Sequence, residues 1–123
     1  MIGVVMKRDM DLIRQILLTV EAHHSGFAPQ IEIDGYTQEE INYHAFLLGE
    51  AGLAKVNDVT SMGSKSPEAI IVNLTWEGHE FLDSARENRI WNLTKDAISK
   101  LGGASIQIWT ALLIAQAKKE LHI

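Results

Sequence analysis

The chain has 123 residues, of which 46% are apolar, which is enough for the buried core of one small domain and argues against a disordered chain. It has no cysteine, which excludes disulfide bonds and thiol chemistry. The formal net charge is −5 and the basic residues are scattered, so any nucleic acid would have to bind at a local basic surface.

The first predicted elements are a helix over residues 10–23 and a short strand over residues 30–34. Apolar residues recur at helical spacing after Asp9, whose side chain can cap the first turn, and Gly26 is the expected end of the helix. In QIEID, Ile31 and Ile33 alternate with polar residues and a glycine follows, as in a short strand closed by a turn.

A second helix is predicted over residues 37–51, and a two-stranded hairpin follows it. Thr37 and Glu40 have the spacing of a capping box, and Gly52 is the expected end of this helix. The strands are expected at LAKVNDV and AIIVNL. The polar segment TSMGSKSPE between them is predicted to be the exposed tip of a wing.

The remainder of the chain is predicted to be helical. Thr75 can cap a third helix, which continues or restarts over residues 90–101, and Gly102-Gly103 separates it from a last helix over residues 105–121. The predicted class is α+β. Residues 1–85 would form a winged-helix-like core of helix, short strand, helix and two-stranded wing, and residues 86–123 a helical extension packed on it that could mediate dimerisation.

Three segments carry a resemblance to a known family. MKRDMDLIR from Met6, YHAFLLGEAGL from Tyr43 and LTWEGHEFLD from Leu74 resemble a family of small bacterial and phage proteins built on a domain of unknown function. The resemblance covers nearly the whole chain after Met6, which leaves Met1 and Met6 as alternative starts. It implies no activity that could be transferred.

The same segments are similar, more widely, to winged helix-turn-helix regulators. In those proteins a leucine-rich helix ending Glu-Ala-Gly-Leu precedes a wing, and a helix beginning Leu-Thr-x-x-Gly follows it, here at Leu74, Thr75 and Gly78. This sequence departs from the pattern between its first two helices, where it predicts a strand in place of a short helix. The resemblance implies DNA contact and a dimer formed by the C-terminal helices.

The helix over residues 37–51 is expected to divide into a core face and an outer face. The core face would carry Thr37, Ile41, His44, Leu47, Leu48 and Ala51. The candidate DNA- or partner-binding residues are those of the outer face, with three more at the wing tip: Gln38, Glu39, Asn42, Phe46 and Glu50, with Ser64, Lys65 and Ser66. Gly49 shares the outer face.

These residues suit two kinds of partner. Gln38 and Asn42 could contact base edges while Lys65 meets the DNA backbone, but Glu39 and Glu50 would lie near phosphates with no basic residue on the same helix. Phe46 between polar groups is instead typical of an anchor for a protein partner. Burial of Phe46 under the C-terminal helices is an equally weighted alternative.

No motif indicates an enzyme. The sequence has no phosphate-binding loop of the right spacing, no nucleophile elbow and no pair of histidines at helical metal-ligand spacing, so no catalytic residue, metal or cofactor is predicted. We interpret His44 as a packed histidine with one hydrogen-bond partner. No segment approaches the roughly 20 apolar residues needed to span a bilayer, and the start is not signal-like. A cytoplasmic protein without a membrane partner is therefore expected.

The last helix is apolar around much of its circumference and therefore needs burial on more than one side. We predict that it forms the seam of a homodimer, through Ile106, Ile108, Trp109, Leu112 and Leu113. The alternative is that it fills a groove within its own chain, against the first helix and Trp91.

The sequence leads to two functional hypotheses. The first, favoured by a narrow margin, is a non-enzymatic DNA-binding regulator of phage or mobile-element type. The alternative is a protein-interaction module that keeps the winged-helix shape without binding DNA, for example a phage factor acting on a host protein. The acidic composition and the lack of the short helix expected between the first two helices favour the alternative, and the overall resemblance favours the first.

Overall fold

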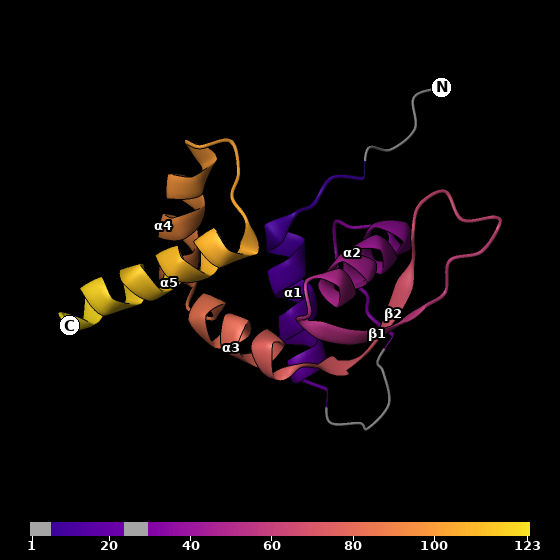
Figure 1. Cartoon of the computed structure of the whole chain (residues 1–123), viewed down its shortest axis with the longest axis horizontal. Coiled ribbons are helices and arrows are strands. Elements are labelled where there is room, and N and C mark those ends of the chain that lie inside the picture. The colour runs from indigo at the N-terminus through magenta and orange to yellow at the C-terminus, as the bar shows by residue number, and fades with distance from the viewer. Residues whose placement is uncertain (1–5, 24–29) are drawn as a thin grey trace. The chain divides into compact units, whose positions relative to one another are not determined.

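The computed structural model describes residues 6–23 and 30–123, and within them the chain forms five helices and one antiparallel sheet of two strands. The predicted α+β class is therefore confirmed. In chain order the elements are α1 (Met10–Glu21), α2 (Gln38–Glu50), β1 (Ala54–Asp58), β2 (Ala69–Leu74), α3 (Trp76–Ala85), α4 (Asn88–Ser99) and α5 (Ile106–Leu121) (Figure 1). The chain divides into two compact units, Met1–His79 and Glu80–Ile123, and the boundary between them lies within α3.

Helix α1 begins where the sequence predicts. The carboxylate of Asp9 accepts a hydrogen bond from the backbone N–H of Leu12 at 3.2 Å and thereby satisfies one of the free donors of the first turn. The helix buries Leu12, Ile13, Ile16 and Leu17 and packs on α2 and β2. It ends at Glu21, two residues before the predicted end, and the expected stop at Gly26 lies outside the described residues.

The strand predicted over residues 30–34 is not formed, and this expectation was wrong. The described sheet contains β1 and β2 alone, and the backbone carbonyl of Ile33 accepts a hydrogen bond from Tyr36 N–H at 3.2 Å, which closes a turn. Gly35 takes a φ of +89° in that turn, a conformation that favours glycine. Of the two alternating isoleucines, Ile31 is buried in the core and Ile33 is only partly buried. The alternation therefore comes from one core residue and does not indicate a strand.

Helix α2 and the hairpin pack together in the first unit (Figure 1). The predicted capping box is present: Thr37 Oγ1 accepts from Glu40 N–H at 3.1 Å, and the Glu40 carboxylate accepts from Thr37 N–H at 3.0 Å. Gly49 lies directly against Val56 of β1, so a Cβ at this position would crowd the valine methyl groups. The strands pair antiparallel, with an irregularity between Lys55 and Val56.

A short junction joins the end of α2 to the start of α3. The hydroxyl of Thr75 donates to the carbonyl of Gly52 at 2.6 Å and accepts from Gly78 N–H at 3.0 Å, which confirms Thr75 as the cap of α3. Its backbone N–H donates to the Leu53 carbonyl at 3.1 Å. Gly78 is buried against that same carbonyl group, which leaves no room for a side chain.

The second unit is built on a pair of stacked indoles. Trp91 of α4 and Trp109 of α5 lie with ring centroids 4.6 Å apart at an interplanar angle of 26°, and both are buried. Gly102 and Gly103 adopt positive φ angles of 79° and 135° between the two helices, as the predicted break requires. A separate helix restarts at Asn88, where Glu87 caps it by accepting from Ile90 N–H at 2.7 Å.

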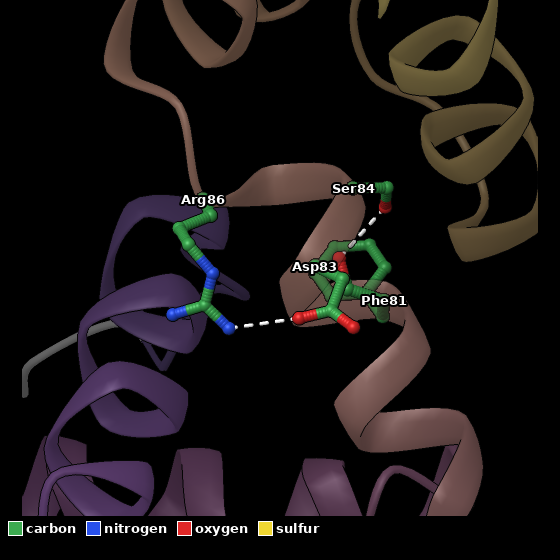
Figure 2. A network of polar contacts seen from close by, with 4 residues as sticks. All are labelled: Phe81, Asp83, Ser84 and Arg86. Carbon is green, nitrogen blue, oxygen red and sulfur yellow. Dashed lines mark hydrogen bonds and ion pairs between the residues drawn. The ribbon is translucent and has the colours of Figure 1, made fainter.

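The end of α3 carries a small polar network (Figure 2). The guanidinium of Arg86 pairs with the Asp83 carboxylate at 2.8 Å, and Ser84 Oγ donates to the Phe81 carbonyl at 2.7 Å. Both charged side chains are largely exposed, so the pair contributes little to stability. Among the described residues, no helix has the length and apolar character needed to cross a membrane.

Candidate functional site

Helix α2 presents three faces, and the buried one holds the helix in the core. Its buried side chains are Ile41, His44, Ala45 and Leu48. Of the predicted core face, Leu47 is partly exposed, Ala51 is exposed and Thr37 is the exposed cap. The buried face is therefore rotated toward Ala45, a position that the sequence analysis did not assign to the core.

The outward face of α2 carries two carboxylates and two aromatic rings. Glu39, Tyr43, Phe46 and Glu50 are spaced by four, three and four residues, which places them in one row along a helix. We call this row the acid–aromatic stripe. Its first three members are partly exposed, and Glu50 is exposed. No lysine or arginine occurs in α2, so the carboxylates of the stripe have no balancing cation on their own helix.

Tyr43 is the member of the stripe that the sequence analysis missed. Its spacing of four residues after Glu39 was the available indication. Its ring meets the His44 ring edge to face, with centroids 5.7 Å apart. Phe46 is neither fully covered nor fully exposed, an outcome between the two alternatives considered for it.

The third face of α2 turns toward β2. Gln38 and Asn42, predicted as outward contacts, are joined by a hydrogen bond from Gln38 Nε2 to Asn42 Oδ1 at 2.9 Å. Both line a half-open cavity of about 240 Å³ between α2, β2 and the segment before α2. The lining residues of this amide-rimmed cavity are Gln30, Ile31, Gln38, Ile41, Asn42, Ala45, Ala69, Ile70 and Ile71.

The loop between β1 and β2, predicted as the tip of a wing, places its predicted residues in different surroundings. Ser64 Oγ donates to the Glu68 carboxylate at 2.9 Å and accepts from Ser61 N–H at 3.0 Å, so this hydroxyl serves the loop itself. The Ser66 hydroxyl is buried. Lys65 is exposed, as predicted, and Met62, which the sequence analysis did not single out, is fully exposed at the tip. Of the three predicted residues, Lys65 is therefore the most accessible to a partner.

His44 links the starts of α1 and α2. Its Nε2 accepts a hydrogen bond from the Asp9 backbone N–H at 2.8 Å, and its Nδ1 donates to the Glu40 carbonyl at 2.8 Å. This pattern requires the neutral ring with its proton on Nδ1. The histidine was predicted to pack with one partner, and it packs with two. Because both nitrogens are engaged inside the core, neither is available to a metal or a substrate.

Tyr36 also contacts Asp9 at the start of α1, and this contact makes the stability of the fold depend on pH. Its hydroxyl donates to Asp9 Oδ2 at 3.1 Å. Partial burial, followed by the hydrogen bond and the negative charge of Asp9, raises the pKa of Tyr36 from 10.0 to about 12. Because the folded state holds this proton more tightly than the unfolded state, the contribution to stability is complete below pH 10 and is lost as pH rises through 12.

We expect Tyr36→Phe to lower the free energy of unfolding by about 1 kcal/mol at neutral pH, because it removes one partly buried hydrogen bond. The difference between wild type and variant should shrink as pH rises from 10 to 12. Urea denaturation across this range measures the difference. Asp9→Asn is the control, because removing the charge should bring the Tyr36 pKa, followed by tyrosinate absorbance, back toward its ordinary value. A difference that does not change with pH would contradict the assignment.

The residues of α5 that were predicted to form a dimer seam differ in their burial. Trp109 and Leu113 are buried, whereas Ile106 and Leu112 are partly exposed. Ile108 is 47% exposed, and Ile114, which was not predicted, is 45% exposed. The homodimer stays a prediction, with the exposed isoleucines as its most accessible residues.

The described residues contain no group of three or more histidine, aspartate or glutamate side chains placed to hold a metal ion. The two candidate surfaces of the first unit are the acid–aromatic stripe and the amide-rimmed cavity. They lie on adjacent faces of α2, because Asn42 belongs to the cavity and Tyr43 to the stripe.

Fold and surfaces together define a small α+β protein in which a capped helix packs on an antiparallel hairpin. The chain belongs to the family described as "Hypothetical protein (DUF2513)", which matches residues 7–105 and confirms the predicted resemblance to a family built on a domain of unknown function. A Haemophilus influenzae protein described as "Uncharacterized protein" is 41% identical over 96 residues, which are 76% of this chain and 79% of that protein. No solved structure matches the chain.

Proposed function

We propose that the chain is a non-enzymatic protein-interaction module with a winged-helix-like core, and that the acid–aromatic stripe of α2 receives a basic surface of a protein partner. The observation that supports this most directly is the composition of the stripe. Tyr43 and Phe46 offer apolar rings of the kind that anchor interfaces, and Glu39 and Glu50 flank them with negative charge. Arginine or lysine on the partner would complement the two carboxylates and orient the complex.

The DNA-binding regulator, of phage or mobile-element type, is the alternative, and the same helix argues against it. A helix that enters the major groove needs cations or free amide groups on its outward face. The outward face of α2 carries carboxylates, and the amides of Gln38 and Asn42 bond to each other beside the cavity. Lys65 at the wing tip is the one predicted DNA contact that remains exposed and cationic.

A salt series separates the two functions. Labelled random and genomic DNA fragments are titrated with the protein from low to physiological salt, and binding is followed by fluorescence anisotropy. Non-specific affinity for DNA comes from basic side chains that neutralise phosphates. Because α2 carries no lysine or arginine, we expect no binding even at low salt. An affinity that falls linearly with the logarithm of salt concentration, and that weakens in Lys65→Ala, would establish the regulator and overturn the proposal.

The partner surface is tested by capture from a lysate of the source organism, followed by titration of the captured protein. Phe46→Ala and Glu50→Lys should each weaken binding about tenfold or more, the loss expected for an interface anchor and for a reversed charge. Glu77→Lys is the matched control, because it makes the same charge change at an exposed position on α3. Unchanged binding in both stripe variants would remove the stripe from the interface.

A further inference from the structure

Helix α4 carries a row of exposed side chains on the side opposite its buried face. We call it the α4 row, and its members are Arg89, Leu93, Asp96 and Lys100. The buried residues of the helix are Trp91, Thr94 and Ile98, which lie on the other side at about 100° per residue. Leu93 is 40% exposed, and the three charged members are exposed as well. The row therefore points away from the core of the second unit.

The α4 row has the same spacing as the acid–aromatic stripe of α2. In both helices the members follow one another after four, three and four residues, which is the spacing of the contact seam between two packed helices. Both rows lie opposite the buried face of their helix. The stripe begins and ends with a carboxylate, whereas the α4 row begins with a guanidinium and ends with an ammonium group. The two rows thus match in length and carry opposite charges at their ends.

In an antiparallel arrangement of the two rows, each charged end would meet its opposite. Glu39 would lie opposite Lys100, and Glu50 opposite Arg89. The ion pairs that these two cations make within the chain are at the surface. Lys100 Nζ is 4.0 Å from the Asp96 carboxylate with both side chains 76% exposed, and Arg89, which pairs with a glutamate of α5, is 63% exposed. Since exposed pairs contribute little to stability, these cations can exchange partners at low cost.

The two middle positions are complementary in the same arrangement. The Phe46 ring would lie against the exposed side chain of Leu93. The Tyr43 hydroxyl would lie opposite Asp96, whose carboxylate can accept a hydrogen bond from it. A parallel arrangement would instead set the Phe46 ring against the Asp96 carboxylate, which would lose hydration without gaining a partner. The antiparallel arrangement is therefore favoured.

We propose that the α4 row of a second copy of the chain docks antiparallel on the acid–aromatic stripe. The inference rests on the proposed function of the stripe and names its partner as the protein itself. Because each copy has one stripe and one α4 row, two copies can make this contact twice in a symmetric dimer. The contact is separate from the dimer seam predicted on α5.

Self-association of the purified full chain is measured by sedimentation equilibrium from about 10 µM to about 1 mM, a range that covers the weak complexes expected of small interfaces. We expect the wild type to associate, and to associate less as salt concentration rises, because ion pairs at both ends of the contact contribute to it. Glu50→Lys and Arg89→Glu should each weaken the association about tenfold or more, because each sets like charges against each other.

A mixture of these two variants identifies the contact. When a Glu50→Lys copy meets an Arg89→Glu copy, opposite charges face each other again in both contacts, so the mixture should associate about as tightly as the wild type. Recovery in the mixture also shows that each variant is folded. Glu77→Lys and Lys95→Glu are the matched controls, because they make the same charge changes at exposed positions outside both rows and should leave association unchanged.

Three results would overturn the proposal: a wild-type chain that stays monomeric over the whole range, variants that associate as the wild type does, or a mixture that fails to recover. The proposed function is judged separately. A monomeric chain that still binds a captured protein through Phe46 and Glu50 would overturn this inference and leave the stripe as the site of another partner. Stripe variants that change neither self-association nor capture would remove both.

Discussion

Gly78→Ala should lower the free energy of unfolding by about 2–3 kcal/mol, although alanine is normally the better helix residue by about 1 kcal/mol. Gly78 lies in the first turn of α3, where the residue is buried. A Cβ there would overlap the carbonyl oxygen of Leu53 and lie 2.9 Å from its carbonyl carbon. Because the obstacle is backbone, α3 must move away from the end of α2, and the bonds of Thr75 to Gly52 and Leu53 would stretch.

Urea denaturation followed by circular dichroism measures this loss. Gly63→Ala is the matched control, because Gly63 lies in the loop between β1 and β2, has no positive φ, and a Cβ there would meet only Ser61 Oγ, at 4.0 Å. We expect that variant to stay within about 0.5 kcal/mol of wild type. A Gly78→Ala protein as stable as wild type would show that helix propensity governs this position and that the close approach to Leu53 has no energetic consequence.

The same junction explains why the family resemblance indicates fold rather than activity. The ending Gly52-Leu53 and the sequence Leu74, Thr75 and Gly78 are far apart in the chain and meet here through two hydrogen bonds and one backbone contact. Each residue type is needed for its geometry: a hydroxyl to cap and bridge, and a glycine to let two backbones touch. Motifs of this kind position α2 without determining what α2 binds.

Local chemistry made most of the elements predictable from the sequence. Capping side chains at Asp9, Thr37 and Thr75 satisfy backbone donors of their own first turns, so each helix start depends on a few neighbouring residues. The hairpin and the Gly102-Gly103 break are equally local. The failed strand at residues 30–34 depended on pairing with a distant strand, and period-two alternation of Ile31 and Ile33 cannot show that a partner is present.

The candidate site was predicted less well, because the faces of a helix are set by what packs on them. Periodicity placed Asn42 and Gly49 with the outward residues, but β1 and β2 cover that side of α2 and turn the outward row toward Tyr43. A shift of the outward row by one residue position is enough to replace the amide of Asn42 with the aromatic ring of Tyr43. The cavity between α2 and β2 has no indication in the sequence, since residues that are distant in the chain line it.

The apolar last helix shows the same limit. Periodicity indicated an α5 that is apolar on more than one side, but it could not show which apolar residues its own chain covers. The stack on α4 takes Trp109, whereas Ile108 and Ile114, which lie on different sides of α5, stay exposed. The predicted seam thus mixed residues that hold the second unit together with residues that remain free to meet a second copy.

Trp91→Ala should be the most damaging substitution in the second unit and lower the free energy of unfolding by about 3–5 kcal/mol, the loss typical of a large aromatic side chain removed from a core. Trp91 is 1% exposed, and its ring stacks on Trp109, which is itself 4% exposed, so truncation leaves a cavity beside an indole. Urea denaturation measures the loss.

The matched control for this substitution is Trp76→Ala, because Trp76 is 75% exposed and we expect its truncation to change stability by about 0.5 kcal/mol or less. A double-mutant cycle with Trp109→Ala isolates the stack from the general effect of cavity formation. The stability loss of the double variant should be smaller than the sum of the two single losses by about 0.5–1.5 kcal/mol. This difference is the contribution of an aromatic pair beyond its buried area. Strict additivity would show that the two indoles are buried independently, and the α4–α5 pair would then owe its stability to aliphatic contacts such as those of Ile98 and Leu113.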